Sequence, residues 1–385
     1  MTGTRGSDLT LRLVLLAAAG ALLAGCTPGS GPAASPSPEP ATAPAGASDA
    51  ASVPPSSPDA EPDDGPAPSG EPTVVATGLA APWSVVLLDG TPLVSERDSA
   101  RILALDLDGT AREVGTVEGV DTAGEGGLLG LALDDAGRLF VYSTGPDGNR
   151  IQRYGLSGGP GSLRLGEPTT ILDGLPSASF HDGGRLAVGP DGMLYATVGD
   201  AGDRDSAQDL DSLGGKILRM TLDGGVPDDN PFDGSLVYSY GHRNVQGLAW
   251  SDDGTLFATE FGQDTWDELN VIAPGANYGW PEVEGIAEVG EYVDPVQQWE
   301  PSEASPSGMA YLEGTLYLAN LRGQVLRAVP VGDPSTATEL YAGEYGRLRD
   351  VLPGPDGDLW FVTNNTDGRG SPAPEDDRIL AVPVG

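Results

Sequence analysis

One unit occurs six times between residues 85 and 360 of this chain, and it limits the fold more than any other feature. Each copy has an apolar run, a tight turn rich in Asp and Gly, and a second apolar run. The copies begin at Val85, Leu131, Leu186, Leu248, Met309 and Val351. Turns of this composition let two flanking strands pair as an antiparallel hairpin. The sequence therefore predicts six β-hairpins.

A further short apolar strand pattern follows each hairpin, at residues 101–105, 150–154, 216–220, 268–272, 324–328 and 378–382. Six hairpins with trailing strands, at periods of roughly 45 to 60 residues, are typical of a propeller. We predict an all-β, six-bladed β-propeller with four-stranded blades. A separate strand at 73–76 precedes the first hairpin, and we expect it to close the ring as the outer edge of the last blade. The alternative, a β-sandwich or two smaller β domains, gives no reason for six equal hairpins.

The first 25 residues have the organisation of a secretory signal. Arg5 and Arg12 precede an apolar run at 13–23, and small residues lead to Cys26. The run is short for a membrane span. Its end resembles a bacterial lipobox, which implies cleavage before Cys26 and lipidation of the Cys26 thiol. We therefore expect a lipoprotein, anchored extracytoplasmically to the outer face of the bacterial cell membrane. An ordinary secretory signal with a chance cysteine is the alternative.

Residues 26–72 are rich in Pro, Ala and Ser, and the stretch 27–71 contains no aromatic residue, Lys or Arg. Such a composition cannot bury enough apolar surface to offset its ordering entropy. We expect a disordered tether there, followed by a propeller domain at 73–385.

Charge and cysteine content exclude several classes of function. Asp and Glu number 57 against 20 Lys and Arg, a formal net charge of −37. A surface this acidic repels phosphate backbones, so nucleic acid is not an expected partner. Cys26 is the only cysteine, which excludes disulfides, thiolate zinc sites and a cysteine nucleophile in the propeller.

The chain has two histidines, His181 and His242, and each lies in a polar, Gly-flanked segment just before an inner strand. A lone histidine is more often structural than functional. Repeat symmetry, however, places both at the same end of the ring, near the axis where propeller sites form. We therefore expect at least one of them to serve the site.

A series of short motifs extends this hypothesis to a family. They lie, in order, at residues 124–130, 181–185, 198–202, 213–219, 229–232, 241–244, 267–270 with 277–281, and 346–350. The chain resembles the soluble quinoprotein glucose dehydrogenases and aldose sugar dehydrogenases, six-bladed propellers that use pyrroloquinoline quinone (PQQ) and calcium. The resemblance extends from residue 73 to residue 385. It implies oxidation of an aldose sugar at the anomeric carbon to a lactone, with hydride transfer to PQQ and an unidentified electron acceptor.

The resemblance also implies roles for individual residues. His181 would take the proton of the anomeric hydroxyl, and Asp200 would orient it; imidazole titrates near neutrality and suits this task. Arg243 and Asn244 match residues that contact the quinone oxygens, where negative charge develops. The catalytic residues would be His181, Asp200 and Arg243.

Other matched positions concern the cofactor carboxylates and the metal. Arg347 and Arg349 alternate along a strand and match the pair that holds the carboxylates of PQQ. Glu125 and Arg322 are further cofactor-binding candidates. Gly262 and Gln263 would ligate calcium, largely through backbone carbonyls, and hard oxygen donors suit that ion.

Several positions depart from the family pattern. Glu125 stands where the family often has Gln, Phe261 where it has a polar residue, Gln263 where it has Pro, and Phe180 where the glucose dehydrogenases have Asp. The cofactor-contacting Lys is replaced by Arg322 if the strand has no gap, or by Leu321 if Arg-Gly is matched.

Two other functions remain open at this stage. One is a calcium-dependent, lactonase-like propeller hydrolase, which would need side-chain carboxylates and amides on the axis. The other is a catalytically silent cell-surface propeller that binds a sugar or a protein.

Overall fold

The computed structural model describes residues 67–106 and 108–385. The expected signal peptide, Cys26 and the tether as far as residue 66 lie outside the described residues. Within the described part, no helix is long and apolar enough to cross a membrane.

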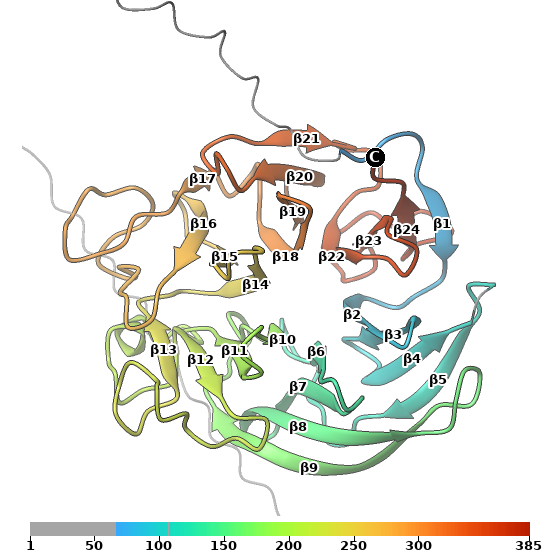
Figure 1. Ribbon diagram of the computed structural model, residues 1–385, viewed down its shortest axis with the longest axis horizontal. Coiled ribbons are helices and arrows are strands. Elements are labelled where there is room, and N and C mark those ends of the chain that lie inside the picture. The colour runs from blue at the N-terminus through green and yellow to red at the C-terminus, as the bar shows by residue number, and fades with distance from the viewer. Residues whose placement is uncertain (1–66, 107) are drawn as a thin grey trace, which may run out of the picture. The chain divides into compact units, whose positions relative to one another are not determined.

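The described chain forms six four-stranded antiparallel sheets around a central axis (Figure 1). From the innermost to the outermost strand, the first three blades are β2 (Pro82–Leu88), β3 (Thr91–Glu96), β4 (Arg101–Leu105), β5 (Ala111–Thr116); β6 (Leu128–Leu133), β7 (Leu139–Gly145), β8 (Gly148–Ser157), β9 (Arg164–Leu175); and β10 (Leu186–Val188), β11 (Leu194–Val198), β12 (Lys216–Met220), β13 (Val237–Tyr240).

The other three blades are β14 (Val245–Trp250), β15 (Leu256–Glu260), β16 (Asp267–Ile272), β17 (Gln297–Trp299); β18 (Pro306–Leu312), β19 (Thr315–Asn320), β20 (Val325–Pro330), β21 (Thr338–Leu340); and β22 (Leu348–Pro353), β23 (Leu359–Thr363), β24 (Ile379–Val382), β1 (Thr73–Ala76). The six-bladed propeller is confirmed. Each predicted hairpin forms the two inner strands of a blade, and each trailing pattern contributes the third.

The ring is closed by β1, as the sequence predicts. β1 pairs antiparallel with β24, with Thr73 opposite Ala381 and Val74 opposite Leu380. The last blade therefore combines strands from both ends of the domain. This pairing covers an edge of β24 that would otherwise expose unpaired backbone groups.

The Asp/Gly turns adopt the backbone conformation that their residues favour. Gly192 and Gly357 have positive φ angles of +75° and +82°, a region that glycine enters without steric cost. In the first of these turns, Asp191 Oδ1 accepts a hydrogen bond from the Met193 backbone N–H over 3.1 Å. Because these contacts join residues that are close together in the chain, the hairpins can be predicted from the sequence.

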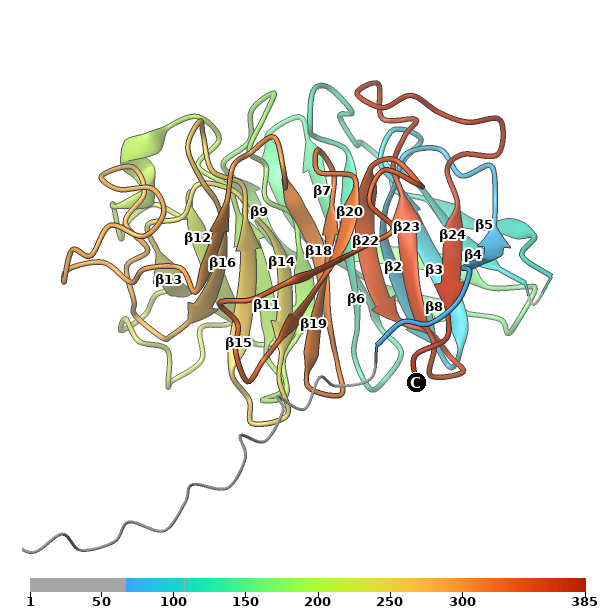
Figure 2. The ribbon, with the colours of Figure 1, turned by 90° about the horizontal axis from the view of Figure 1, so that it is seen from above.

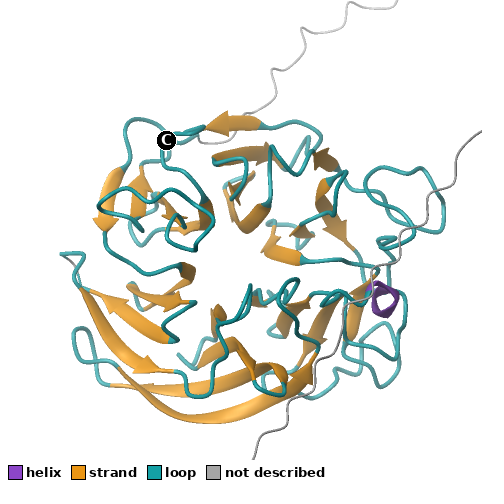
Figure 3. Cartoon of the chain, turned by 180° about the vertical axis from the view of Figure 1, so that it is seen from behind, coloured by secondary structure: helices purple, strands orange, loops and turns teal. Residues whose placement is uncertain are grey.

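The alternation of loops in an antiparallel blade determines where a site can form. The loops entering the inner strands and those joining second to third strands lie at one end of the ring, because successive strands reverse direction. Figure 2 shows the loop between β23 and β24 rising on one face, with the chain's C-terminus near the opposite face. The short 3₁₀ helix η1 (Arg204–Ala207), the helix drawn in Figure 3, lies in the loop between β11 and β12 on the former face.

Candidate active site

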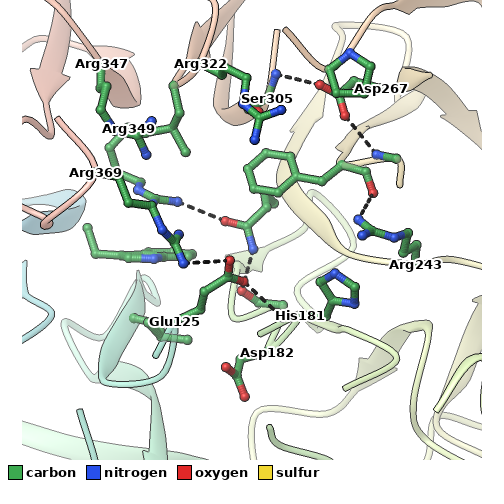
Figure 4. Close-up of a pocket in the computed structure, with 18 of the residues that line it drawn as sticks. Glu125, His181, Asp182, Arg243, Asp267, Ser305, Arg322, Arg347, Arg349 and Arg369 are labelled. Carbon is green, nitrogen blue, oxygen red and sulfur yellow. Dashed lines mark hydrogen bonds and ion pairs between the residues drawn. The ribbon is translucent and has the colours of Figure 1, made fainter. Parts of the chain in front are cut away.

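A cavity of about 320 Å³ opens on this loop-rich face at the axis (Figure 4). The residues that line it include six arginines: Arg97, Arg243, Arg322, Arg347, Arg349 and Arg369. Their acidic neighbours in the lining are Glu125, Asp182 and Asp267. In a chain with a net charge of −37, this concentration of guanidinium groups indicates a site for an anionic ligand.

Arg347 and Arg349, at the start of the innermost strand β22, both reach this cavity. Arg347 Nη2 pairs with the buried Asp367 carboxylate over 3.0 Å. Arg349 is 5% exposed, and its Nη1 donates to neutral acceptors, Gln246 Oε1 at 3.1 Å and Ser307 Oγ at 3.3 Å. Burial lowers the pKa of Arg349 to about 9. The Asp367 carboxylate acts on this guanidinium from nearby, but no carboxylate among the described residues bonds to it directly, so a ligand carboxylate would supply a bonded counter-charge.

Arg97 and Arg369 extend the cationic lining, and neither is among the residues expected from the sequence. Arg369, in the loop between β23 and β24, pairs through Nη2 with Glu125 Oε1 over 3.2 Å. Glu125 Oε2 in turn accepts the backbone N–H of His181 over 2.9 Å. The negative charge of Glu125 is thus compensated locally, and the same carboxylate fixes the backbone at His181.

His181 and Asp200 form a hydrogen-bonded pair at the cavity wall. His181 Nδ1 lies 2.7 Å from Asp200 Oδ1. A carboxylate at this position favours the tautomer with hydrogen on Nδ1. His181 Nε2, which has no hydrogen-bond partner among the described residues, is then the nitrogen that can accept a proton. His181 has a positive φ of +61°, a conformation that costs energy outside glycine and that often marks functional positions.

Asp200 is held in its ionised form by its neighbours. Burial acts to raise the pKa of Asp200, but hydrogen bonds from His181, the Gly202 backbone N–H and Trp280 outweigh it and leave the pKa below its usual value. An anionic partner of this kind stabilises an imidazolium ion. The pair therefore has the arrangement of a general base with its orienting carboxylate.

Arg243 and Asn244 follow β13 and take different positions. Arg243 lines the cavity, and its Nη1 donates to the Phe261 carbonyl oxygen over 3.0 Å. Asn244 is fully buried within the wall, where its Oδ1 accepts the Gly183 backbone N–H over 3.0 Å. Asn244 Nδ2 and Arg243 Nε are buried with no protein partner among the described residues. Asn244 is not among the residues that line the cavity, so the structure does not bring it to the position that the resemblance implies.

The structure separates the two histidines that repeat symmetry placed together. His242 is completely buried, and both ring nitrogens are occupied: Nδ1 lies 2.8 Å from Glu260 Oε2, and Nε2 lies 2.8 Å from Ser239 Oγ. Its ring stacks on Tyr278 with a centroid separation of 4.7 Å. The symmetry argument is therefore satisfied by His181, and His242 is a structural residue next to Arg243.

We expect His242→Ala to reduce stability rather than chemistry. The change leaves the Glu260 carboxylate buried without its imidazole partner, which should lower the free energy of unfolding by ~3–5 kcal/mol. Denaturant unfolding measures this loss, and activity per folded molecule should stay within a few-fold of wild type. A full-stability His242→Ala protein that has lost its activity would contradict the structural assignment.

Gly262 and Gln263, the expected calcium ligands, lie in the cavity lining on the loop between β15 and β16. Two carboxylates hold this loop through its backbone: Asp267 Oδ1 accepts the Gly262 N–H over 2.8 Å, and Glu284 Oε1 accepts the Gln263 N–H over 2.5 Å. No group of three or more His, Cys, Asp or Glu side chains in the described part of the chain is arranged to hold a metal. A calcium site here would depend on backbone oxygens, as the family resemblance implies.

Leu321 and Arg322 are the two residues that could match the family's cofactor-contacting lysine. Both lie in the loop between β19 and β20, and both line the cavity. Arg322 is exposed, and its positive charge acts on the nearby buried Asp267 carboxyl. The guanidinium, not the leucine, adds to the cationic lining.

Comparison with known proteins decides the family. The family model for glucose/sorbosone dehydrogenase matches residues 79–371. The chain belongs to this family. A solved structure of the PQQ-bound form of aldose sugar dehydrogenase from Streptomyces coelicolor is 50% identical, with a TM-score of 0.78, and the match covers 83% of this chain and 100% of that one.

Two curated proteins are also similar in sequence to this member of the glucose/sorbosone dehydrogenase family. Aldose sugar dehydrogenase YliI of Escherichia coli is 34% identical over 64% of this chain and 76% of its own length. Quinoprotein glucose dehydrogenase B of Acinetobacter calcoaceticus is 34% identical over 52% of this chain, and the match spans only 49% of that relative. Homologous enzymes of this family are oxidoreductases that act on sugars.

Proposed function

We propose that this protein is a PQQ-dependent aldose sugar dehydrogenase that oxidises the anomeric carbon to give a lactone. The observation that carries the proposal is an axial cavity lined by arginines and bordered by the His181–Asp200 pair. The hydrolase alternative calls for axial carboxylates and amides around a metal, whereas this cavity is dominated by guanidinium groups. The similar proteins described above include two aldose sugar dehydrogenases, one of them solved in its PQQ-bound form.

The residues present fit the proposed cofactor. PQQ is a planar tricarboxylate quinone, and when bound it supplies a hydride acceptor. Arg347 and Arg349, with Arg322, would bind its carboxylates through charge-assisted hydrogen bonds. Arg243, which lines the cavity, would face the quinone oxygens, whereas Asn244 would support the wall behind it through its bond to the Gly183 N–H. Glu125, held by Arg369, contributes to this wall without leaving an uncompensated negative charge.

The proton in this reaction moves to His181. The O–H bond of the anomeric hydroxyl breaks as its proton passes to His181 Nε2, and the C–H bond electrons leave with the hydride, so the carbon becomes a carbonyl. Asp200 holds His181 Nδ1 and stabilises the imidazolium that results. Arg243 presents positive charge in the cavity, where negative charge develops.

Reconstitution tests the proposed function directly. The purified protein should bind PQQ, and the absorbance of bound PQQ should change when an aldose is added. A methyl glycoside of the same sugar lacks the anomeric hydroxyl and should give no change. Bound PQQ that no aldose reduces would favour the silent propeller, and lactone hydrolysis without PQQ would favour the hydrolase.

We propose further that calcium binds at the backbone oxygens of Gly262 and Gln263. Removal of divalent ions with a chelator should then weaken PQQ binding, because the cation offsets the negative charge of the ligand. Re-addition of calcium should restore the affinity. A PQQ titration curve that is identical with and without the chelator would contradict this placement.

The location of the protein is a proposal from the sequence alone. If Cys26 carries a lipid, Cys26→Ser should release the protein into the medium or leave it unprocessed, since single-site lipidation is then lost. Membrane fractionation and immunoblotting measure the distribution. Unchanged membrane attachment of the Cys26→Ser protein would rule out the lipid anchor.

A further inference from the structure

Trp280 contacts the catalytic machinery from behind the cavity wall. It lies in the long loop between β16 and β17, is 7% exposed, and does not line the axial cavity. Its indole Nε1–H donates to Asp200 Oδ2 over 2.8 Å. Its backbone is anchored on both sides, because its N–H donates to the Gly241 carbonyl at 2.9 Å and its carbonyl accepts Gln208 Nε2 at 2.7 Å.

The two carboxylate oxygens of Asp200 accept hydrogen bonds from different donors. Oδ1 accepts hydrogen bonds from His181 Nδ1 at 2.7 Å and from the Gly202 backbone N–H at 2.8 Å. Among the described residues, Oδ2 has one side-chain donor, the Trp280 indole. This donor fixes the rotation of the carboxylate, so that Oδ1 stays directed at the imidazole.

The faces of the same indole contact two guanidinium groups. The Arg204 guanidinium carbon lies 5.1 Å from the ring centroid, and that of Arg243 lies 5.5 Å from it. Both distances are in the range of cation–π attraction. Trp280 therefore contacts both the carboxylate behind the proposed base and the arginine that faces the cavity.

We propose that Trp280 is a positioning residue that holds the His181–Asp200 pair through its N–H and Arg243 through its ring face. The inference rests on the proposed function for its consequence in turnover, but the contacts themselves do not. Trp280→Phe separates the two contributions, because phenylalanine keeps an aromatic face and removes the hydrogen-bond donor. Trp280→Leu removes both.

Loss of the indole donor should make Asp200 a stronger acceptor for His181. The other charged groups around the pair are Glu125, which accepts the His181 backbone N–H, the neighbouring Asp182, and Arg243 and Arg204 beside the ring. These groups remain in place in Trp280→Phe. The imidazolium form of His181 should then persist to higher pH.

The first test is an NMR titration of the imidazole signals in the full-length protein without cofactor. Only two histidines are present, and His181→Asn assigns the signals. In Trp280→Phe the titration midpoint of His181 should rise by ~0.5–1 pH unit, the scale expected when one hydrogen bond to a charged group is lost. Trp250→Phe, on β14 and distant from the pair, is the matched control. An unshifted His181 midpoint would overturn the proposal, whether or not the protein oxidises sugars.

The second test is a double-mutant cycle in the PQQ-loaded protein. Trp280→Phe should lower kcat by ~10-fold, with little change in KM for the sugar, and the acid limb of the kcat profile should move to higher pH. In an Asp200→Asn background the same change should cost less than about twofold, because the two residues act through one contact. Equal losses in both backgrounds would show a merely structural role. A wild type that oxidises no sugar would defeat the proposed function instead, and the NMR result would then decide this inference.

The role of the ring face is measured separately by PQQ affinity. Trp280→Phe should bind PQQ within about twofold of wild type, whereas Trp280→Leu should bind it several-fold more weakly, because Arg243 loses its support. Thermal unfolding confirms that each variant is folded. Equal PQQ affinity in the two variants would remove Arg243 from the proposal.

Discussion

Replacement of His181 should lower the rate of cofactor reduction by a sugar ~10²–10⁴-fold, the usual contribution of a positioned general base, with PQQ still bound. The physical reason is that Nε2 is the free proton acceptor of a ring whose other nitrogen is held by Asp200. The backbone φ of +61° at this position strains most residues. His181→Asn is therefore the preferred variant beside His181→Ala, since asparagine tolerates this conformation best after glycine.

Single-turnover reduction of bound PQQ is the appropriate measurement, because it excludes reoxidation by an electron acceptor. His242→Ala is the internal comparison, and it should reduce bound PQQ within a few-fold of wild type. If the His181 variants react at the wild-type rate while His242→Ala does not, the roles assigned to the two histidines are reversed.

The Arg347→Ala/Arg349→Ala double variant should bind PQQ more weakly by several kcal/mol, from ~1.5–3 kcal/mol for each charge-assisted hydrogen-bonding group. Arg349 should contribute strongly, because its protein partners are the neutral Gln246 and Ser307 side chains. Titration of the cofactor-free protein with PQQ measures the change.

A variant with the same loss of charge elsewhere provides the control. Arg112→Ala/Arg164→Ala removes two guanidinium groups from a different surface, beside β5 and β9, and should leave PQQ affinity nearly unchanged. Because Arg347→Ala leaves the buried Asp367 carboxylate without its ion pair, Arg349→Ala alone is measured as well. Wild-type PQQ affinity in both the double and the single variant would reject the assignment of this cofactor clamp.

The propeller was predictable because its signals are local. Each hairpin turn depends on residues next to one another, such as Asp191 bonding to the Met193 N–H, and the six copies reinforce one another. The outer strands β5, β9, β13, β17 and β21 are less evident in the sequence. β5, β9 and β21 contain several exposed residues, and β13, β17 and β21 are only three or four residues long, so their apolar patterns are weaker or shorter.

Candidate site residues that belong to short motifs could be identified from the sequence. Those that are defined by long-range contacts could not. His181, Asp200, Arg243, Arg347 and Arg349 are found from short motifs. Arg369 is not, because it lies in a polar loop outside these motifs, and its partner Glu125 is far away in the chain. Arg97 follows β3 in a segment with no distinguishing pattern.

The sequence by itself determined the repeat, which depends on local turn chemistry and strand periodicity, and the unpaired strand before the first hairpin predicted the ring closure. Its short motifs supplied the candidate residues through the resemblance to a family. Only the tertiary structure decided which histidine faces the cavity, since His181 and His242 have similar positions in their repeats and differ in what packs against them. The tertiary structure also brings the Trp280 indole to Asp200 and the Arg369 guanidinium to the Glu125 carboxylate. The residues of each pair come from different blades around the axis. The spacing of residues along one blade therefore does not predict these pairs.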